Sequence, residues 1–125
     1  MSQKTILVVD DSAIDCAFLE EVLGEAGYEV DTASTGEEAL EKVRAKEYNL
    51  IFIDHALPCM DGVQLCEKIK KLSPKSVPLY MTGKIRGEDL VRGEVAFSQA
   101  GGKVYQLYKP FSSEEILEAA RKALQ

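Results

Sequence analysis

The sequence has few of the residues that build common metal and disulfide sites. Among its 125 residues are one histidine and three cysteines, Cys16, Cys59 and Cys66. They lack the repeated close spacing of zinc ligands, so we expect no zinc site. The cysteine count is odd and the amino-terminal residues do not resemble a signal peptide. Both features favour a reducing compartment, and we expect a cytoplasmic protein.

Long apolar runs and an excess of positive charge are also missing. No apolar stretch approaches the roughly 20 residues that cross a bilayer. The 21 acidic residues outnumber the 15 basic ones, which gives a formal net charge of −6. A nucleic-acid-binding domain usually presents a basic face. We therefore expect neither a nucleic-acid partner nor a membrane partner.

Short apolar runs alternate with amphipathic stretches along the whole chain. The runs lie near 5–9, 28–33, 49–53, 77–81 and 104–108. This alternation predicts an α/β fold in which one parallel sheet of five strands is covered on both faces by five helices. No linker, repeat or low-complexity tract interrupts it, so we expect a single domain over residues 1–125 with no output domain.

The helices are predicted from apolar spacing and from cap signatures. The first helix is marked by Ile14, Phe18, Val22 and Ala26, which recur at every fourth position. Ser34 with Glu37, and Ser112 with Glu115, have the spacing of a capping box and predict the starts of the second and fifth helices. A third helix is expected to begin at Asp61-Gly62, and a fourth to contain Leu90, Val91, Val95 and Phe97.

Acidic residues follow two of the predicted strands where each strand ends. Asp54 closes the apolar run Leu50-Ile51-Phe52-Ile53, and Asp10-Asp11 follow the first run. Ligands of open parallel sheets bind at the carboxyl ends of the strands. Three carboxylates gathered there need a cation, and oxygen ligands of this kind suit Mg²⁺. The sequence therefore predicts an acidic, metal-dependent site.

Two further polar residues are predicted to lie at the same edge. Thr82 follows the fourth run and Lys109 the fifth. Asp54 is suited to attack a phosphorus atom as a nucleophile, with Thr82 and Lys109 binding the transferred group. Each residue also has an ordinary structural interpretation. Asp10-Asp11 could cap a helix with Ser12, Thr82 could bond local backbone, and Lys109 could be solvated.

The chain resembles the receiver domain of two-component response regulators over essentially its whole length. The resemblance is carried by Val8-Val9-Asp10-Asp11-Ser12, by the pattern Asp-x-x-x-Pro-x-Met-Asp-Gly from Asp54 to Gly62, by Met81-Thr82-Gly83 and by Tyr108-Lys109-Pro110-Phe111. It implies a doubly wound, flavodoxin-like sheet with the strand order 2-1-3-4-5.

The same resemblance implies a role for each residue of the site. Asp54 would be the phosphoacceptor. Asp11 would bind Mg²⁺ directly, Asp10 would bind it partly through water, and the backbone carbonyl of Ala56 would add another ligand. Thr82 would bond the phosphoryl group and move on activation, and Lys109 would pair with it.

The chain departs from the family at two places. Most receivers carry an aromatic residue three positions before the lysine of the fifth strand, where this chain has Gln106. Either a bulge brings Tyr105 into that place, or the protein couples its state differently. The segment 83–100 is also longer than is usual in the family, which is explained by a long loop beside the output face or by a tolerated surface insertion.

The leading hypothesis is a phosphorylation-controlled signalling switch that is regulatory and not an enzyme in the usual sense. A sensor histidine kinase or a histidine phosphotransfer protein would supply the phosphoryl group, and a downstream protein would receive the signal. Homodimer formation on phosphorylation is left open. The main alternative is an interaction module of the same fold that acts independently of phosphorylation.

Two other classes fit the sequence less well. A phosphatase with an aspartyl intermediate would need a second aspartate two residues after Asp54, where the chain has Ala56. A flavin-binding protein of the same fold would place the cofactor phosphate beside Asp10-Asp11, which would repel it.

Overall fold

The structure is a computed structural model that describes residues 3–54, 57, 60–81, 88–104, 107 and 111–125. The expectations for Ala56, Thr82, Tyr105, Gln106 and Lys109 therefore concern positions outside the described residues.

Five parallel strands form one sheet in the order β2-β1-β3-β4-β5, which confirms the predicted fold class. The strands are β1 (Thr5–Val9), β2 (Glu29–Ala33), β3 (Leu50–Asp54), β4 (Val77–Met81) and β5 (Lys103–Val104). The first four lie within one residue of the predicted runs, and β5 overlaps the last run at Val104.

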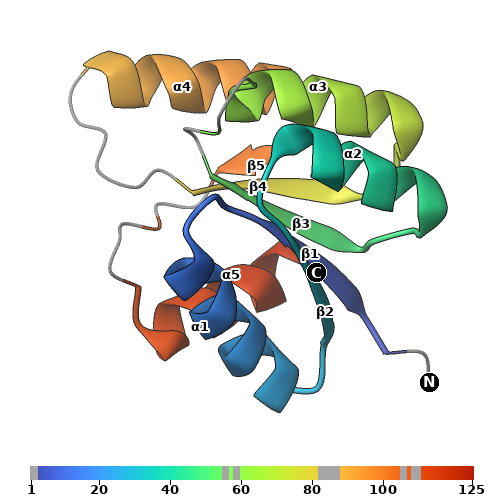
Figure 1. Cartoon of the computed structure of the whole chain (residues 1–125). Helices are drawn as coiled ribbons and strands as arrows, with labels where there is room; N and C mark the ends of the chain where they lie inside the picture. Colours follow the sequence, from blue (N-terminus) through green and yellow to red (C-terminus); the bar gives the residue numbers. More distant parts are fainter. Residues whose placement is uncertain (1–2, 55–56, 58–59, 82–87, 105–106, 108–110) are drawn as a thin grey trace.

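Five helices connect and follow the strands. They are α1 (Ala13–Glu25), α2 (Gly36–Ala45), α3 (Gly62–Leu72), α4 (Glu88–Gln99) and α5 (Ser113–Ala123). Figure 1 shows α2, α3 and α4 on one face of the sheet and α1 and α5 on the other. Among the described residues, none of these helices combines the length and the apolar content needed to cross a membrane.

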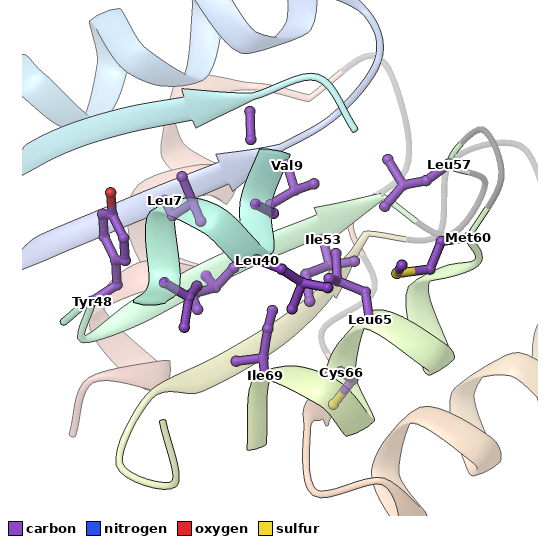
Figure 2. Packing of buried hydrophobic residues seen from close by; sticks show 14 of the residues in the cluster. Leu7, Val9, Leu40, Tyr48, Ile53, Leu57, Met60, Leu65, Cys66 and Ile69 are labelled. Atoms are coloured by element: carbon purple, nitrogen blue, oxygen red, sulfur yellow. The ribbon is translucent and has the colours of Figure 1, made fainter. Parts of the chain in front are cut away.

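Alternate residues of each central strand point into two separate cores. On the side of α2 and α3, Leu7, Val9 and Ile53 pack against residues such as Leu40 and Leu65 (Figure 2). On the side of α1 and α5 the core contains Ile6, Val8, Leu19, Leu23, Leu50, Phe52, Leu79, Met81, Ile116 and Ala120. Both faces of the central strands are thus buried, which explains why their sequences are continuous apolar runs.

Helix α1 forms around the residues that marked it in the sequence, but Ile14 and Phe18 of that stripe are not on its buried face. Leu19 and Leu23 are fully buried, whereas 82% of Ile14 and 36% of Phe18 are exposed. The helix carries apolar residues on two sides, and the side that meets α5 and the sheet is the one buried. Spacing alone could not distinguish the two sides.

Two of the cap predictions are confirmed and one is wrong. Asp61 opens α3 in a capping box with Gln64, and Ser112 opens α5 in one with Glu115. The cap of α2 is Thr35 and not Ser34, because the Thr35 hydroxyl accepts from the backbone N–H of Glu38 at 3.0 Å.

Candidate functional site

Strand register brings the acidic residues of β1 and β3 to one edge of the sheet. Val9 is the register partner of Ile53, so the next residues, Asp10 and Asp54, lie beside one another where the two strands end. One carboxylate oxygen from each of Asp10, Asp11 and Asp54 lies within 4.8 Å of the others. The three carboxylates that the sequence placed at this edge therefore lie close together in the structure.

The three carboxylates differ in burial. Asp10 is fully buried and Asp54 is only 4% exposed, while Asp11 is exposed. Oδ1 of Asp10 accepts a hydrogen bond from the backbone N–H of Ser12 at 2.9 Å. This bond fixes the turn that leads from β1 into α1 and sets the orientation of the Asp10 carboxylate.

The helix-cap interpretation of Asp10-Asp11 is not supported by the local geometry. Ser12 is the N-cap of α1, and its hydroxyl accepts from the backbone N–H of Asp15 at 3.3 Å. Because the cap is the serine, the two aspartates before it are available to the acidic cluster.

The donor set fits a hard divalent cation. All three groups are carboxylates, and two of them are removed from bulk water at the end of the sheet. Negative charges this close repel one another, and the repulsion is strong where water is excluded. A cation such as Mg²⁺ takes oxygen ligands and few protein groups, which suits this cluster.

The acidic cluster opens into a groove between α1 and the end of β2. The groove has a volume of about 360 Å³ and contains Asp10, Asp11, Cys16, Glu20, Ser34 and Glu38 on its walls. The Cys16 thiol donates to the backbone carbonyl of Asp10 at 3.2 Å. Glu38 accepts from the backbone N–H of Ser34 at 2.7 Å, and this bond, with the Ser34 hydroxyl and Lys42, lowers the pKa of Glu38. Two members of the cluster, Asp10 and Asp11, thus line an acidic groove that is open to solvent.

Helix α1 also carries an exposed apolar surface outside this groove, which its sequence does not distinguish from the buried side. Ile14 and Phe18 are exposed on the helix that begins directly after the acidic turn. Their regular spacing predicts the helix but does not indicate which of its sides stays exposed.

The chain is similar to known proteins over most of its length. A family model described as the response regulator receiver domain matches residues 6–121. The alkaline phosphatase synthesis transcriptional regulatory protein PhoP of Bacillus subtilis (strain 168) is 37% identical over 113 residues, which cover 90% of this chain and 45% of that protein. Protein PilG of Pseudomonas aeruginosa is 36% identical over 118 residues, or 93% of this chain and 84% of that protein.

The fold has equally close counterparts among solved structures. A CheY-like response regulator receiver domain protein from Methanospirillum hungatei JF-1 superposes with a TM-score of 0.89 at 33% identity. The match covers 98% of this chain and 94% of that chain.

Proposed function

Because the chain belongs to the response regulator receiver family of two-component systems, we propose that it is a signalling switch controlled by phosphorylation of Asp54. The observation that carries this proposal is the meeting of Asp10, Asp11 and Asp54, with Asp54 at the end of a central strand. Proteins of this family are regulatory phosphoacceptors and not enzymes in the usual sense. We propose that residues 1–125 act together as one such domain.

In the proposed reaction, a carboxylate oxygen of Asp54 attacks the phosphorus of a phosphohistidine on the donor protein. A P–O bond forms while the bond from phosphorus to the imidazole nitrogen breaks, and the nitrogen keeps the electron pair. The low exposure of Asp54 limits access of bulk water to the product, which slows its loss by hydrolysis.

Asp10, Asp11 and Asp54 would hold a Mg²⁺ ion, together with the backbone carbonyl of Ala56. When bound, the ion supplies positive charge to the oxygens of the transferred phosphoryl group. The roles of Thr82 and Lys109 rest on their places in the sequence. Thr82 directly follows Met81, the register partner of Asp54, and Lys109 follows the fifth apolar run.

The exposed surface of Ile14 and Phe18 is where we propose that the phosphodonor protein docks. A donor has to bring its phosphohistidine to Asp54 at the carboxyl end of the sheet, and α1 begins two residues after Asp11 of the same cluster. Large exposed apolar side chains on this helix gain free energy when a partner covers them. Asp11 and Glu20 favour a donor with basic groups around its histidine.

The proposal is tested by intact mass after incubation with acetyl phosphate and Mg²⁺. We expect a single phosphoryl adduct on the wild type, no adduct on Asp54→Asn, and loss of the adduct in EDTA. A wild type that takes no phosphoryl group from acetyl phosphate or from a phosphohistidine donor would overturn the proposal. Partner binding that persists in Asp54→Asn would then favour a phosphorylation-independent interaction module.

A further inference from the structure

A pair of aromatic side chains joins the sheet to α4 near the acidic site. Tyr80 of β4 is 4% exposed, and Phe97 of α4 is fully buried. Their ring centroids lie 4.7 Å apart with the planes tilted by 37°. Tyr80 is the register partner of Ile53, so it stands one residue before the level of Asp54. A shift at the end of β4 would therefore reach α4 through this pair.

The hydroxyl end of Tyr80 fits against a glycine inside α4. A Cβ atom placed on Gly93 would lie 2.5 Å from the Tyr80 hydroxyl oxygen and 3.4 Å from the Cζ atom next to it. The first distance is too short for any side chain, while the second is an ordinary contact. Glycine weakens a helix interior relative to alanine, so its place here is explained by the need for space.

A second glycine, Gly102, leaves room for the ring of Phe97. A Cβ on Gly102, just after α4, would lie 2.1 Å from Cε1 of Phe97 and 3.0 Å from Sγ of Cys66. Both ends of the Tyr80–Phe97 pair are thus closely enclosed. Interiors packed this tightly change between discrete arrangements and do not deform continuously.

We propose that the contact between Tyr80 and Gly93 couples the state of Asp54 to the position of α4. The proposal rests on the proposed function, in which Asp54 is phosphorylated. In this proposal the buried aromatic residue that couples the two parts is Tyr80 on β4. Residue 106, which is aromatic in most receivers, is glutamine in this chain. The coupling is steric, so it depends on how well the two residues fill the space between β4 and α4.

Three variants test this fit. Gly93→Ala overfills the contact, Tyr80→Phe leaves it underfilled, and the double variant exchanges the hydroxyl for a methyl group and restores the filled volume. Gly24→Ala in α1 is the matched control, because a Cβ there meets nothing within 4 Å. The readout is hydrogen exchange of the α4 backbone amides with and without acetyl phosphate, with intact mass recorded on the same samples.

For the wild type and Gly24→Ala we expect the phosphoryl adduct to change α4 exchange. Each single variant should form the adduct but lose at least about half of that response, and the double variant should regain it, as expected for residues in direct contact. An adduct without any change in α4, or a double variant no better than Gly93→Ala, would overturn the coupling alone. A wild type without an adduct would count against the proposed function as well.

Discussion

The Tyr48 hydroxyl donates a hydrogen bond of 2.7 Å to Oδ2 of Asp31 on the edge strand β2. Nζ of Lys46 lies 3.2 Å from the same oxygen and 2.7 Å from Oε1 of Glu29. The Tyr48 hydrogen bond, followed by Lys46, holds the pKa of Asp31 below its usual range, although partial burial opposes the shift. Burial and the Asp31 carboxylate raise the pKa of Tyr48 well above its usual value.

Tyr48→Phe should reduce stability at neutral pH by about 1 kcal/mol, because one hydrogen bond to a partly exposed carboxylate is lost. Since the pKa of Asp31 is lowered in the folded state, its contribution is present above the usual value of 3.8 and is lost as the pH falls through the folded-state pKa. The raised pKa of Tyr48 makes its contribution decline as the pH rises above 10.0. Urea unfolding across this range should show the difference from wild type shrinking at both ends.

The control for that variant is Tyr28→Phe. Tyr28 is half-buried, and no hydrogen bond to its hydroxyl occurs within the part of the chain that the structure describes. The variant keeps the hydrogen bond between Tyr48 and Asp31, so it should not reproduce the effect of Tyr48→Phe. A Tyr48→Phe deficit that stayed constant from acid to alkaline pH would show that the hydroxyl acts through packing and not through Asp31.

Removing one carboxylate of the acidic cluster should weaken metal binding. For Asp11→Asn we expect Mg²⁺ affinity to fall at least about tenfold. Loss of a residue that only supports a metal ligand already lowers affinity by about that factor, and Asp11 would itself be a ligand. Glu20→Gln is the matched control, because it removes the same charge from the wall of the same groove but not from the cluster. Titration calorimetry distinguishes the two. An equal loss in both variants would mean that the groove attracts the ion only through its overall charge.

The acidic cluster could be predicted from the sequence because strand ends and parallel order already determine its geometry. Asp10 and Asp54 each follow an apolar run, and neighbouring parallel strands place such residues side by side. The contact between Tyr80 and Gly93 could not be predicted in this way. It depends on where α4 lies on the sheet, and neither residue belongs to a motif that indicates it.

The buried side of α1 could not be predicted from the spacing of its apolar residues, for a related reason. Ile14 and Phe18 recur as regularly as Leu19 and Leu23, and the choice between the two pairs is made by the packing of α5. The predicted cap of α2 was wrong by one residue because Ser34 and Thr35 are both good N-cap residues. In the structure the Glu38 carboxylate accepts from the backbone N–H of Ser34, and Thr35 is the cap.

Cys66 should be unreactive in the folded protein. Its side chain is fully buried on α3 (Figure 2), and burial raises the pKa of its thiol to about 11. Thiolate is the reactive form, so iodoacetamide near pH 8 should leave Cys66 unlabelled in the native protein and label it in urea. Half-exposed Cys16 is the internal comparison. Peptide mapping by mass spectrometry reads both sites, and native labelling of Cys66 would contradict the packing of α3.

The stability linked to Cys66 has a defined pH dependence. Because its folded pKa is raised from 9.0 to about 11, its contribution is complete below 9.0 and is lost as the pH rises toward the folded value. Cys66→Ala should therefore become less different from wild type as the pH rises through that interval. Thermal unfolding at about pH 8 and about pH 10.5 tests this expectation.

The apolar surface of α1 should matter for a protein phosphodonor and not for a small one. Ile14→Asp places a charge in a surface that a docking partner must dehydrate, so the rate of transfer from a phosphohistidine protein should fall by about tenfold or more. The acetyl phosphate adduct should form at the wild-type rate, because that small reagent does not have to dock on α1. Leu72→Asp is the control, since Leu72 is also exposed, at 44%, but ends α3 at the opposite edge of the sheet. Equal losses with both phosphodonors would mean that Ile14 supports the turn that carries Asp10 and Asp11, and would remove the docking role from α1.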